Sequence, residues 1–226
     1  METKIRNIVR AQRITERVFA DVVKTLRVGV TERELVGLIH DRARIHGASG
    51  LSFDPIVAAG SNAADPHHLV PTARKLKRGE LVMIDLGCRF GGYCADMTRM
   101  IAIGCPKPEL RDAHRVVLRA QEAAIATARA GMTGRELDAV ARDIIDRAGY
   151  GSRFIHALGH GIGRKVHQLP RISPKWNRRL KAGEVITIEP GIYVPRQFGI
   201  RIEDMLLITP RGARNLTRTP KRLVVI

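Results

Sequence analysis

The stretch LKRGELVMIDLG at residues 76–87 is repeated with variation as LKAGEVITIEPG at residues 180–191. Six of the twelve positions are identical at an offset of 104, and most of the others exchange one apolar residue for another. Each copy reads as a glycine turn followed by an apolar strand with an acid near its end. The acid is Asp85 in the first copy and Glu189 in the second.

A second pair of matching segments lies upstream of the first. GVTEREL at 29–35 aligns with GMTGREL at 131–137. Two units are too few for a repeat array, which needs at least three. Chance similarity of strand and turn chemistry is the alternative, and two matches at nearly the same offset weaken it. We therefore expect one domain over residues 1–226, built from pseudo-symmetric halves of about 1–105 and 106–226, with no separate N-terminal domain.

The composition is that of a soluble globular protein, with 44% hydrophobic and 27% charged residues. No run of apolar residues approaches the length of a membrane span, and the charged N-terminus is unlike a signal peptide. We expect a cytoplasmic protein with no membrane partner. Three cysteines without an export signal do not suggest a disulfide framework, so reduced thiols are expected.

The formal net charge of +17 favours anionic partners, including nucleic acid or a ribosomal surface. Arg and Lys are spread along the whole chain, however, and an aromatic content of 4% leaves few platforms for stacking bases. A solvated basic surface explains the charge equally well. A nucleic-acid or ribosome partner therefore stays open.

Hydrophobic spacing predicts an α+β protein in which each half opens with two helices. Thr31 and Thr133 each begin a capping box, in which Thr and the Glu three residues later bind free amides at a helix start. A loop after residue 60 carries His67 and His68. The expected helices span 3–27, 31–47, 108–130 and 133–148, and the expected strands lie at 81–86 and within 183–208.

Two predicted hairpins bring acids together. A turn centred between Phe90 and Gly91 would pair Asp85 with Asp96, and opposed side chains share a face about 5 Å apart. The second hairpin would offer Glu189 and Glu203. Such a cluster needs compensation, which divalent cations supply most simply, and His160 is a candidate nitrogen ligand.

The chain resembles the pita-bread metallopeptidases, the family of methionine aminopeptidase, aminopeptidase P, prolidase and creatinase. The resemblance covers nearly the whole chain. It is carried by NAADPHH at 62–68, DLG at 85–87 with DMTR at 96–99, GHGIG at 159–163 with VH at 166–167, IEPGIY at 188–193, and GIRIED at 199–204.

The resemblance implies a pita-bread fold, with helices outside a curved antiparallel sheet, and a two-metal centre. Its ligands would be Asp85, Asp96, His160, Glu189 and Glu203, with Asp96 and Glu203 bridging the metals. The expected cofactors are two divalent ions; manganese is favoured, and cobalt, iron and zinc are alternatives. A bridging hydroxide would attack the peptide carbonyl and Glu189 would shuttle the proton.

Four further residues have roles implied by the same resemblance. His68 and His167 match the histidines that stabilise the tetrahedral oxyanion. His156 either contacts the substrate or supports a ligand by packing or hydrogen bonding. Arg201 matches an arginine that orients a metal-binding carboxylate.

The motifs are similar to the proline-specific branch, since Gly191 stands where methionine aminopeptidases have Met. The resemblance therefore implies an exopeptidase that hydrolyses Xaa-Pro bonds in peptide substrates, as a dipeptidase or an aminopeptidase. Methionine aminopeptidase is the alternative, and a non-catalytic pita-bread module that binds nucleic acid or the ribosome is a third reading. Gln168 departs from the family's usual Glu, which leaves specificity open, and a homodimer is a candidate assembly.

Overall fold

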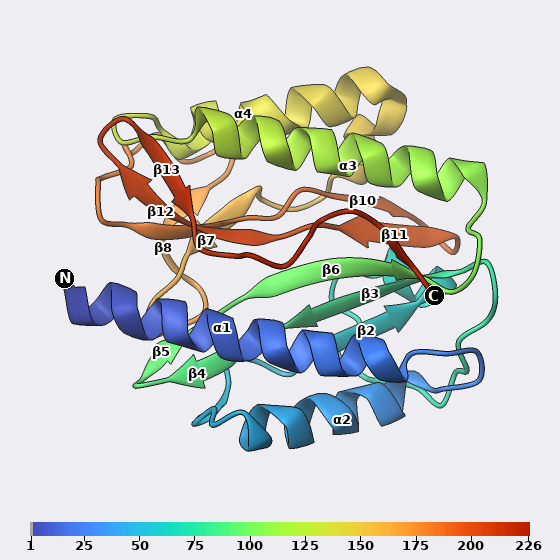
Figure 1. The fold of residues 1–226 in the computed structure, drawn as a ribbon. Helices are drawn as coiled ribbons and strands as arrows, with labels where there is room; N and C mark the ends of the chain where they lie inside the picture. Colours follow the sequence, from blue (N-terminus) through green and yellow to red (C-terminus); the bar gives the residue numbers. More distant parts are fainter. Residues whose placement is uncertain (1) are drawn as a thin grey trace.

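Two helix pairs flank the strands in the computed structural model, which describes residues 2–226 (Figure 1). Helices α1 (Glu2–Thr25) and α2 (Glu32–Ile45) lie along one side, and α3 (Pro108–Thr127) and α4 (Gly134–Ile145) lie along the other. The four expected helices are confirmed. The last ends earlier than expected, because a π-helical turn, η2 (Asp146–Tyr150), and a 3-10 turn, η3 (Gly151–Arg153), follow it.

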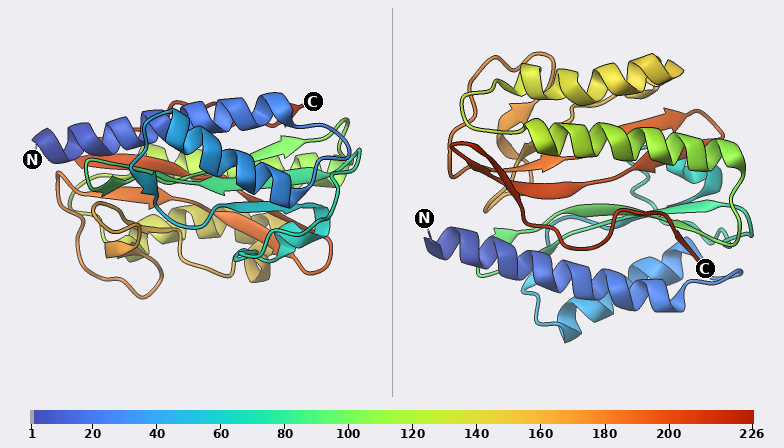
Figure 2. Two further views of the ribbon diagram at one scale, coloured as in Figure 1. Left: turned by 90° about the horizontal axis from the view of Figure 1, so that it is seen from below. Right: turned by 45° about the horizontal axis from the view of Figure 1, so that its top comes forward.

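The strands form two larger and two smaller sheets, so the α+β prediction is confirmed. One larger sheet has the order β14-β6-β3-β2, the other has the order β13-β12-β9-β7-β8, and β10-β11 and β1-β4-β5 form the smaller sheets. The two views in Figure 2 show the strands running between the helix pairs. A short 3-10 helix, η1 (Gly60–Ala64), follows β2. The strand bounds are β1 Gly50–Leu51, β2 Ile56–Ala59, β3 Leu81–Leu86, β4 Cys88–Phe90, β5 Tyr93–Cys94, β6 Met97–Ala102, β7 Gly159–Gly161, β8 Gln168–Ile172, β9 Val185–Ile188, β10 Gly191–Val194, β11 Phe198–Arg201, β12 Asp204–Thr209, β13 Gly212–Asn215 and β14 Val224–Val225.

The two halves make equivalent local contacts. Both predicted capping boxes are present, at Thr31 before α2 and at Thr133 before α4. The segment before each box binds the first residue of each repeated stretch. Leu76 N donates to Val30 O at 2.8 Å, and Leu180 N donates to Met132 O at 2.7 Å. These matching contacts support the prediction of two related halves.

Strand β3 is buried on both faces, which explains its continuous apolar sequence. Val82 and Ile84 belong to the core under α1 and α2, whereas Leu81 and Met83 belong to the core shared with the second half. Because side chains alternate along a strand, Asp85 lies on the same face as Leu81 and Met83. The strand thereby directs its one acid toward the other half of the protein.

The predicted pairing of Asp85 with Asp96 is wrong by two residues. Asp85 lies opposite Thr98 in the β3–β6 ladder. The turn is formed by Gly91 and Gly92, which have φ values of 56° and 77°. Both values are positive, as a two-residue hairpin turn that follows the strand twist requires. A shift of two residues preserves the face, so Asp96 lies diagonally across from Asp85 and on the same side.

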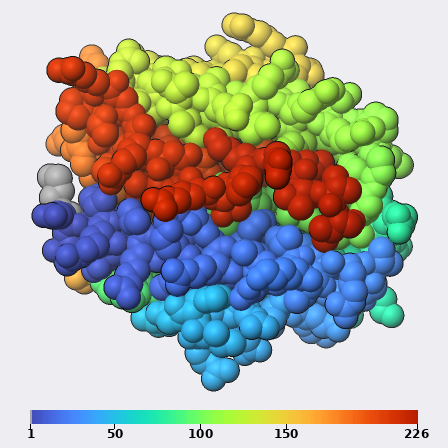
Figure 3. All heavy atoms as spheres, viewed as in Figure 1, coloured from blue at the N-terminus to red at the C-terminus, as the bar shows by residue number. Residues whose placement is uncertain are grey.

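The C-terminal segment closes the seam between the halves. In Figure 3 it runs between α1 and the helix pair of the second half, and β14 adds to β6 as a parallel strand. The buried guanidinium of Arg99 donates to Thr219 O at 2.7 Å, to Pro220 O at 3.0 Å and to Asp204 Oδ1 at 2.7 Å. This arginine ties the segment to both sheets.

Two expectations about the whole chain concern cysteines and membranes. Cys88, Cys94 and Cys105 are all free, as predicted. Across residues 2–226 the structure has no helix whose length and apolar character would allow it to cross a membrane.

The equivalent capping boxes give a test of the two-halves arrangement. Thr31→Ala and Thr133→Ala each remove a side-chain acceptor at a helix start, which lowers the free energy of unfolding by about 1 kcal/mol. Because the two sites lie in different halves, their effects should add, and the double variant is expected to lose about 2 kcal/mol of unfolding free energy. Urea unfolding of the two single variants and the double variant measures this. If the double variant loses no more unfolding free energy than one single variant does, the halves do not unfold as one cooperative unit.

Candidate metal centre

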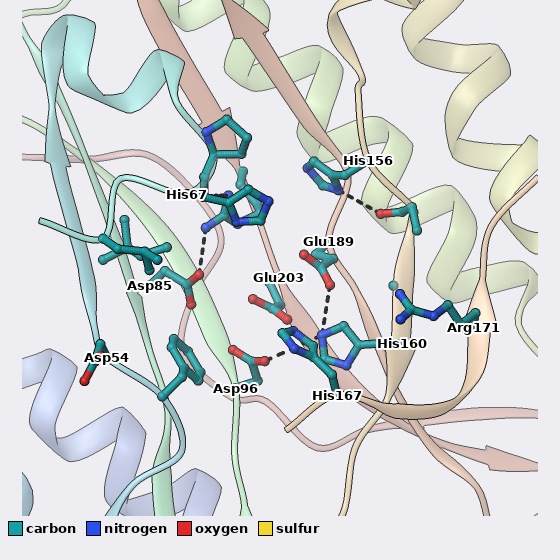
Figure 4. Close-up of a pocket in the computed structure, with 17 residues that line it drawn as sticks. Asp54, His67, Asp85, Asp96, His156, His160, His167, Arg171, Glu189 and Glu203 are labelled. Carbon is teal, nitrogen blue, oxygen red and sulfur yellow. Dashed lines mark hydrogen bonds and ion pairs between the residues drawn. The ribbon is translucent and has the colours of Figure 1, made fainter. Parts of the chain in front are cut away.

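The five predicted metal ligands meet in one cavity of about 590 Å³ (Figure 4). Asp85 comes from β3, Asp96 from the residue before β6, and His160 from β7. Glu189 follows β9, and Glu203 lies between β11 and β12. The cavity therefore draws carboxylates from both halves, as the offset of the repeated stretches suggested.

The second hairpin brings Glu189 and Glu203 to the cavity, as expected from the sequence. Ile188 pairs with Asp204 in the ladder between β9 and β12. The neighbouring residues Glu189 and Glu203 continue the same register and are therefore opposed across the hairpin. Because the two hairpins face each other, all four carboxylates line the same cavity.

His160 is held between two glycines because neighbouring strands approach its backbone closely. A Cβ on Gly159 would lie 2.0 Å from Thr187 O, and a Cβ on Gly161 would lie 2.3 Å from Leu169 O. The Nδ1 atom of His160 lies 3.1 Å from Gly161 O, and it donates there because a carbonyl only accepts. Its Nε2 faces the carboxylates, and this nitrogen would ligate a metal once it had given up its proton.

The geometry fits a divalent cation. One ligand atom from each of Asp96, His160 and Glu203 lies within 4.8 Å of the other two. Asp85 Oδ1 and Glu203 Oε1 are buried and have no hydrogen-bond partner among the described residues. Unpartnered buried polar atoms are rare in folded proteins and call for an explanation. Carboxylate oxygens aimed into a cavity beside an imidazole are the donor set of a divalent-metal site.

The carboxylates destabilise one another in the absence of a cation. Burial raises the pKa of Asp96 well above its usual value, and the charges of Glu203, Asp85 and Glu189 raise it further. Burial likewise raises the pKa of Glu203, and the charges of Glu189 and Asp85 raise it further. Asp96 is 4% exposed and Glu203 is 2% exposed, so water does little to screen this repulsion. A divalent cation would remove it.

Glu189 and His160 partly compensate each other. Burial disfavours the Glu189 carboxylate, but the hydrogen bond and charge of His160 outweigh this effect and lower its pKa. The His160 Nε2 to Glu189 Oε1 distance is 3.2 Å, and Asp96 Oδ2 lies 3.8 Å from the same nitrogen. Thr187 Oγ1 donates to Glu189 Oε1 at 3.1 Å and holds that carboxylate in place.

Arg201 orients carboxylates from both halves. Its Nη2 donates to Asp85 Oδ2 at 2.7 Å, which leaves Asp85 Oδ1 directed into the cavity. Its Nε donates to Thr98 Oγ1 at 3.1 Å, and Thr98 Oγ1 donates to Glu203 Oε2 at 2.8 Å. The guanidinium also donates to the Tyr193 hydroxyl at 2.7 Å. This arrangement supports the predicted role of Arg201, and it adds Thr98 and Tyr193, which the sequence motifs contained without an assigned role.

His156 lines the cavity with both ring nitrogens engaged. Nδ1 lies 2.8 Å from Ala157 O, to which it donates, so Nε2 accepts from the Tyr193 hydroxyl at 2.9 Å. Burial lowers the pKa of His156, which favours this neutral tautomer. Of the two roles left open for His156, the geometry supports the one that acts through Tyr193 and Arg201.

Of two adjacent histidines, the structure places the unexpected one in the cavity. His67 lines the cavity, whereas His68 does not and instead lies 3.1 Å from a carboxylate oxygen of Glu32. The prediction for His68 therefore does not fit this arrangement. The sequence offered no signal to choose between two neighbouring histidines in an irregular loop, because strand alternation does not apply there. His167 lines the cavity as predicted, with its ring centroid 4.4 Å from that of His160.

Gln168 lies beside the cavity rather than in it. It begins β8 and pairs with Gly161. The departure from the family's usual Glu thus falls outside the residues that line the cavity.

Comparison with known proteins places this arrangement among peptidases. A curated relative named Xaa-Pro dipeptidase, from Pyrococcus furiosus, is 42% identical over 98% of this chain. An X-Pro aminopeptidase structure from Thermotoga maritima matches with a TM-score of 0.97 at 42% identity over 100% of this chain. An Xaa-Pro dipeptidase structure from Bacillus anthracis matches with a TM-score of 0.98 at 38% identity over 100% of this chain. These matches confirm the expected fold.

The chain spans less than two thirds of each of these proteins: 63% of the Pyrococcus relative, 64% of the Thermotoga chain and 63% of the Bacillus chain. The model of metallopeptidase family M24 matches residues 6–210, a range that contains all five predicted metal ligands. The motifs, the fold and the carboxylate cluster therefore agree, and the chain belongs to metallopeptidase family M24.

Proposed function

We propose that the protein is a metal-dependent exopeptidase that hydrolyses Xaa-Pro bonds. The observation that carries the proposal is the cluster of three buried carboxylates, the partly buried Glu189 and His160 at the cavity, with Asp85 Oδ1 and Glu203 Oε1 lacking a partner among the described residues. An uncompensated cluster of this kind would cost several kcal/mol per ion. Membership of a metallopeptidase family supplies the compensating group, a divalent metal.

Asp85, Asp96, His160, Glu189 and Glu203 would hold the two ions. The donor set of carboxylates with one imidazole accepts Mn, Co, Fe or Zn, and we propose manganese. When bound, two such ions would polarise the scissile carbonyl and acidify the water that attacks it.

The remaining chemistry is assigned to the protein's own side chains. Glu189 would take the proton from the attacking water and pass it to the departing amine. His67 and His167 line the cavity and would donate hydrogen bonds to the oxyanion of the tetrahedral intermediate. Arg201 and Tyr193 would hold Asp85 in its orientation. His67 thus replaces His68 in the proposed catalytic set.

The preference for proline is supported by the relatives, whose names include both Xaa-Pro dipeptidase and X-Pro aminopeptidase. These names leave the substrate length open. Arg171 is exposed, lines the cavity and stands apart from Asp85 in Figure 4. A guanidinium on a peptide-binding wall complements a free C-terminal carboxylate. We therefore propose dipeptides as the preferred substrates.

Removal of the metal tests the proposal first. Metal-stripped protein is expected to be inactive on Xaa-Pro dipeptides and to regain activity on addition of Mn. Asp96→Ala is expected to abolish both activity and binding of two ions, because it removes a carboxylate that would ligate them. Hydrolysis assays and titration calorimetry measure the two quantities. Cleavage of Met-Ala peptides alone would indicate a methionine aminopeptidase. Salt-sensitive RNA binding without hydrolysis would indicate a binding module.

The adjacent histidines provide a matched pair of variants. His67→Ala is expected to lower kcat by about 10²–10³-fold, the effect of losing one oxyanion donor. His68→Ala is expected to lower it far less, because His68 lies outside the cavity. Steady-state kinetics with saturating Mn measures both. The reverse order of effects would restore the sequence-based assignment.

Arg171 gives a test of substrate length. Arg171→Met is expected to lower kcat/KM for an Xaa-Pro dipeptide by about 10–100-fold, the effect of a lost hydrogen bond to a charged group. The same dipeptide with an amidated C-terminus is the control, because it lacks the carboxylate. Equal losses on the two substrates would contradict carboxylate recognition by Arg171.

A further inference from the structure

Glu32 is a fully buried carboxylate that the proposed chemistry does not use. It is the first residue of α2 and receives hydrogen bonds from one segment of the chain. Oε1 accepts from Ala59 N at 2.8 Å and from Asn62 Nδ2 at 2.9 Å. Oε2 accepts from Thr72 N at 3.1 Å, from Thr72 Oγ1 at 2.6 Å and from His68 Nε2 at 3.1 Å.

In the sequence, some of these donors precede His67 and the others follow it. Residues 65–74 belong to no helix or strand, so no sheet or helix ladder fixes their position. The Glu32 contacts hold the segment at residues 59–62 and again at His68 and Thr72. Arg201 adds one contact from the other half, a long hydrogen bond of 3.4 Å to Pro66 O. Between these anchors the chain presents His67 to the cavity.

The second half holds its histidine segment with different residues. Asp138 on α4 accepts from Leu158 N at 3.0 Å and binds Arg142 at 2.7 Å. Arg142 in turn donates to Phe154 O at 2.8 Å and to His156 O at 2.9 Å. A buried charge on the helix thus anchors the loop that carries the histidine in each half.

A carboxylate at the position of Glu32 is not a requirement of the repeated helix start. The equivalent residue in the second half, at the offset of the capping boxes, is Gly134. A Cβ there would lie 2.2 Å from Arg171 O, so no side chain fits. Both helices begin with a complete capping box nonetheless. Glu32 therefore serves the segment that it binds rather than the helix that carries it.

We propose that Glu32 is a positioning residue that fixes His67 in the cavity by clamping residues 59–72. This inference rests on the proposed function for its kinetic consequence, though the clamp itself is a matter of structure. It also explains why His68, and not His67, turns away from the cavity: the Glu32 carboxylate binds the His68 ring. Burial disfavours the charge on Glu32, but the surrounding donors outweigh it and lower its pKa.

Glu32→Gln is the most informative variant because it keeps the size of the side chain. Each carboxylate oxygen accepts from a backbone N–H that can only donate, Ala59 N at Oε1 and Thr72 N at Oε2, so either orientation of the amide places its NH₂ group against a donor. The amide therefore breaks the clamp on one side without opening a cavity. Glu34→Ala is the matched control. Glu34 lies in the same helix turn but binds only Thr31, at the exposed capping box.

The experiment measures kcat, KM, metal stoichiometry, urea unfolding and the NMR signal of the His67 ring, which is assigned with His67→Ala. We expect Glu32→Gln to bind metal as the wild type does and to lose about 10–100-fold in kcat, the usual effect of removing a supporting residue. The His67 signal is expected to shift or broaden. Glu34→Ala is expected to lose some stability while it retains kcat and the His67 signal.

Two outcomes would overturn the inference. One is a Glu32→Gln variant with wild-type kcat and an unchanged His67 signal. The other is an equal loss of kcat in Glu34→Ala, which would reveal a general effect of weakening α2. Wild-type protein inactive on every peptide would count against the proposed function alone, because the His67 signal still reports whether Glu32 fixes this residue.

Discussion

Repulsion among four clustered carboxylates, three of them buried and one partly buried, is the constraint on which the rest of the structure depends. Asp85 and Asp96 come from the first half, and Glu189 and Glu203 come from the second. The pKa values of Asp96 and Glu203 are raised by burial and by the neighbouring acids. A fold that tolerates such a cluster must hold each carboxylate rigidly and must reserve it for a cation, since unpaired buried charge is among the costliest features of a protein interior.

The surrounding architecture meets this need with directional contacts from opposite halves. Arg201 comes from the second half yet binds Asp85 in the first, and Thr98 in the first half binds Glu203 in the second. Arg99 adds a buried ion pair with Asp204, the residue after Glu203. Removing one half would therefore leave the other with an unsupported acid. The carboxylates of the centre therefore depend on the two halves packing against each other.

The histidines around the cavity are held less directly. His67 and His156 lie on irregular backbone, and helices at the periphery fix their segments through charged groups, Glu32 for His67 and Asp138 with Arg142 for His156. The helices thus do more than cover the sheets. Their inward polar side chains reach the loops that close the cavity, which connects the outer layer of the fold to the reactive groups.

The sequence by itself determined the helices, the central strand and the four acids and one imidazole of the centre. These features follow from short-range rules: hydrophobic period, capping boxes, and an acid at the end of each repeated strand. The hairpin register follows from the local turn at Gly91 and Gly92, whereas tertiary structure decided the choice between His67 and His68. That choice depends on Glu32, which is 36 residues from His68 in the chain. A local pattern carries no information about such a contact, because the contact exists only once α2 has packed against the loop.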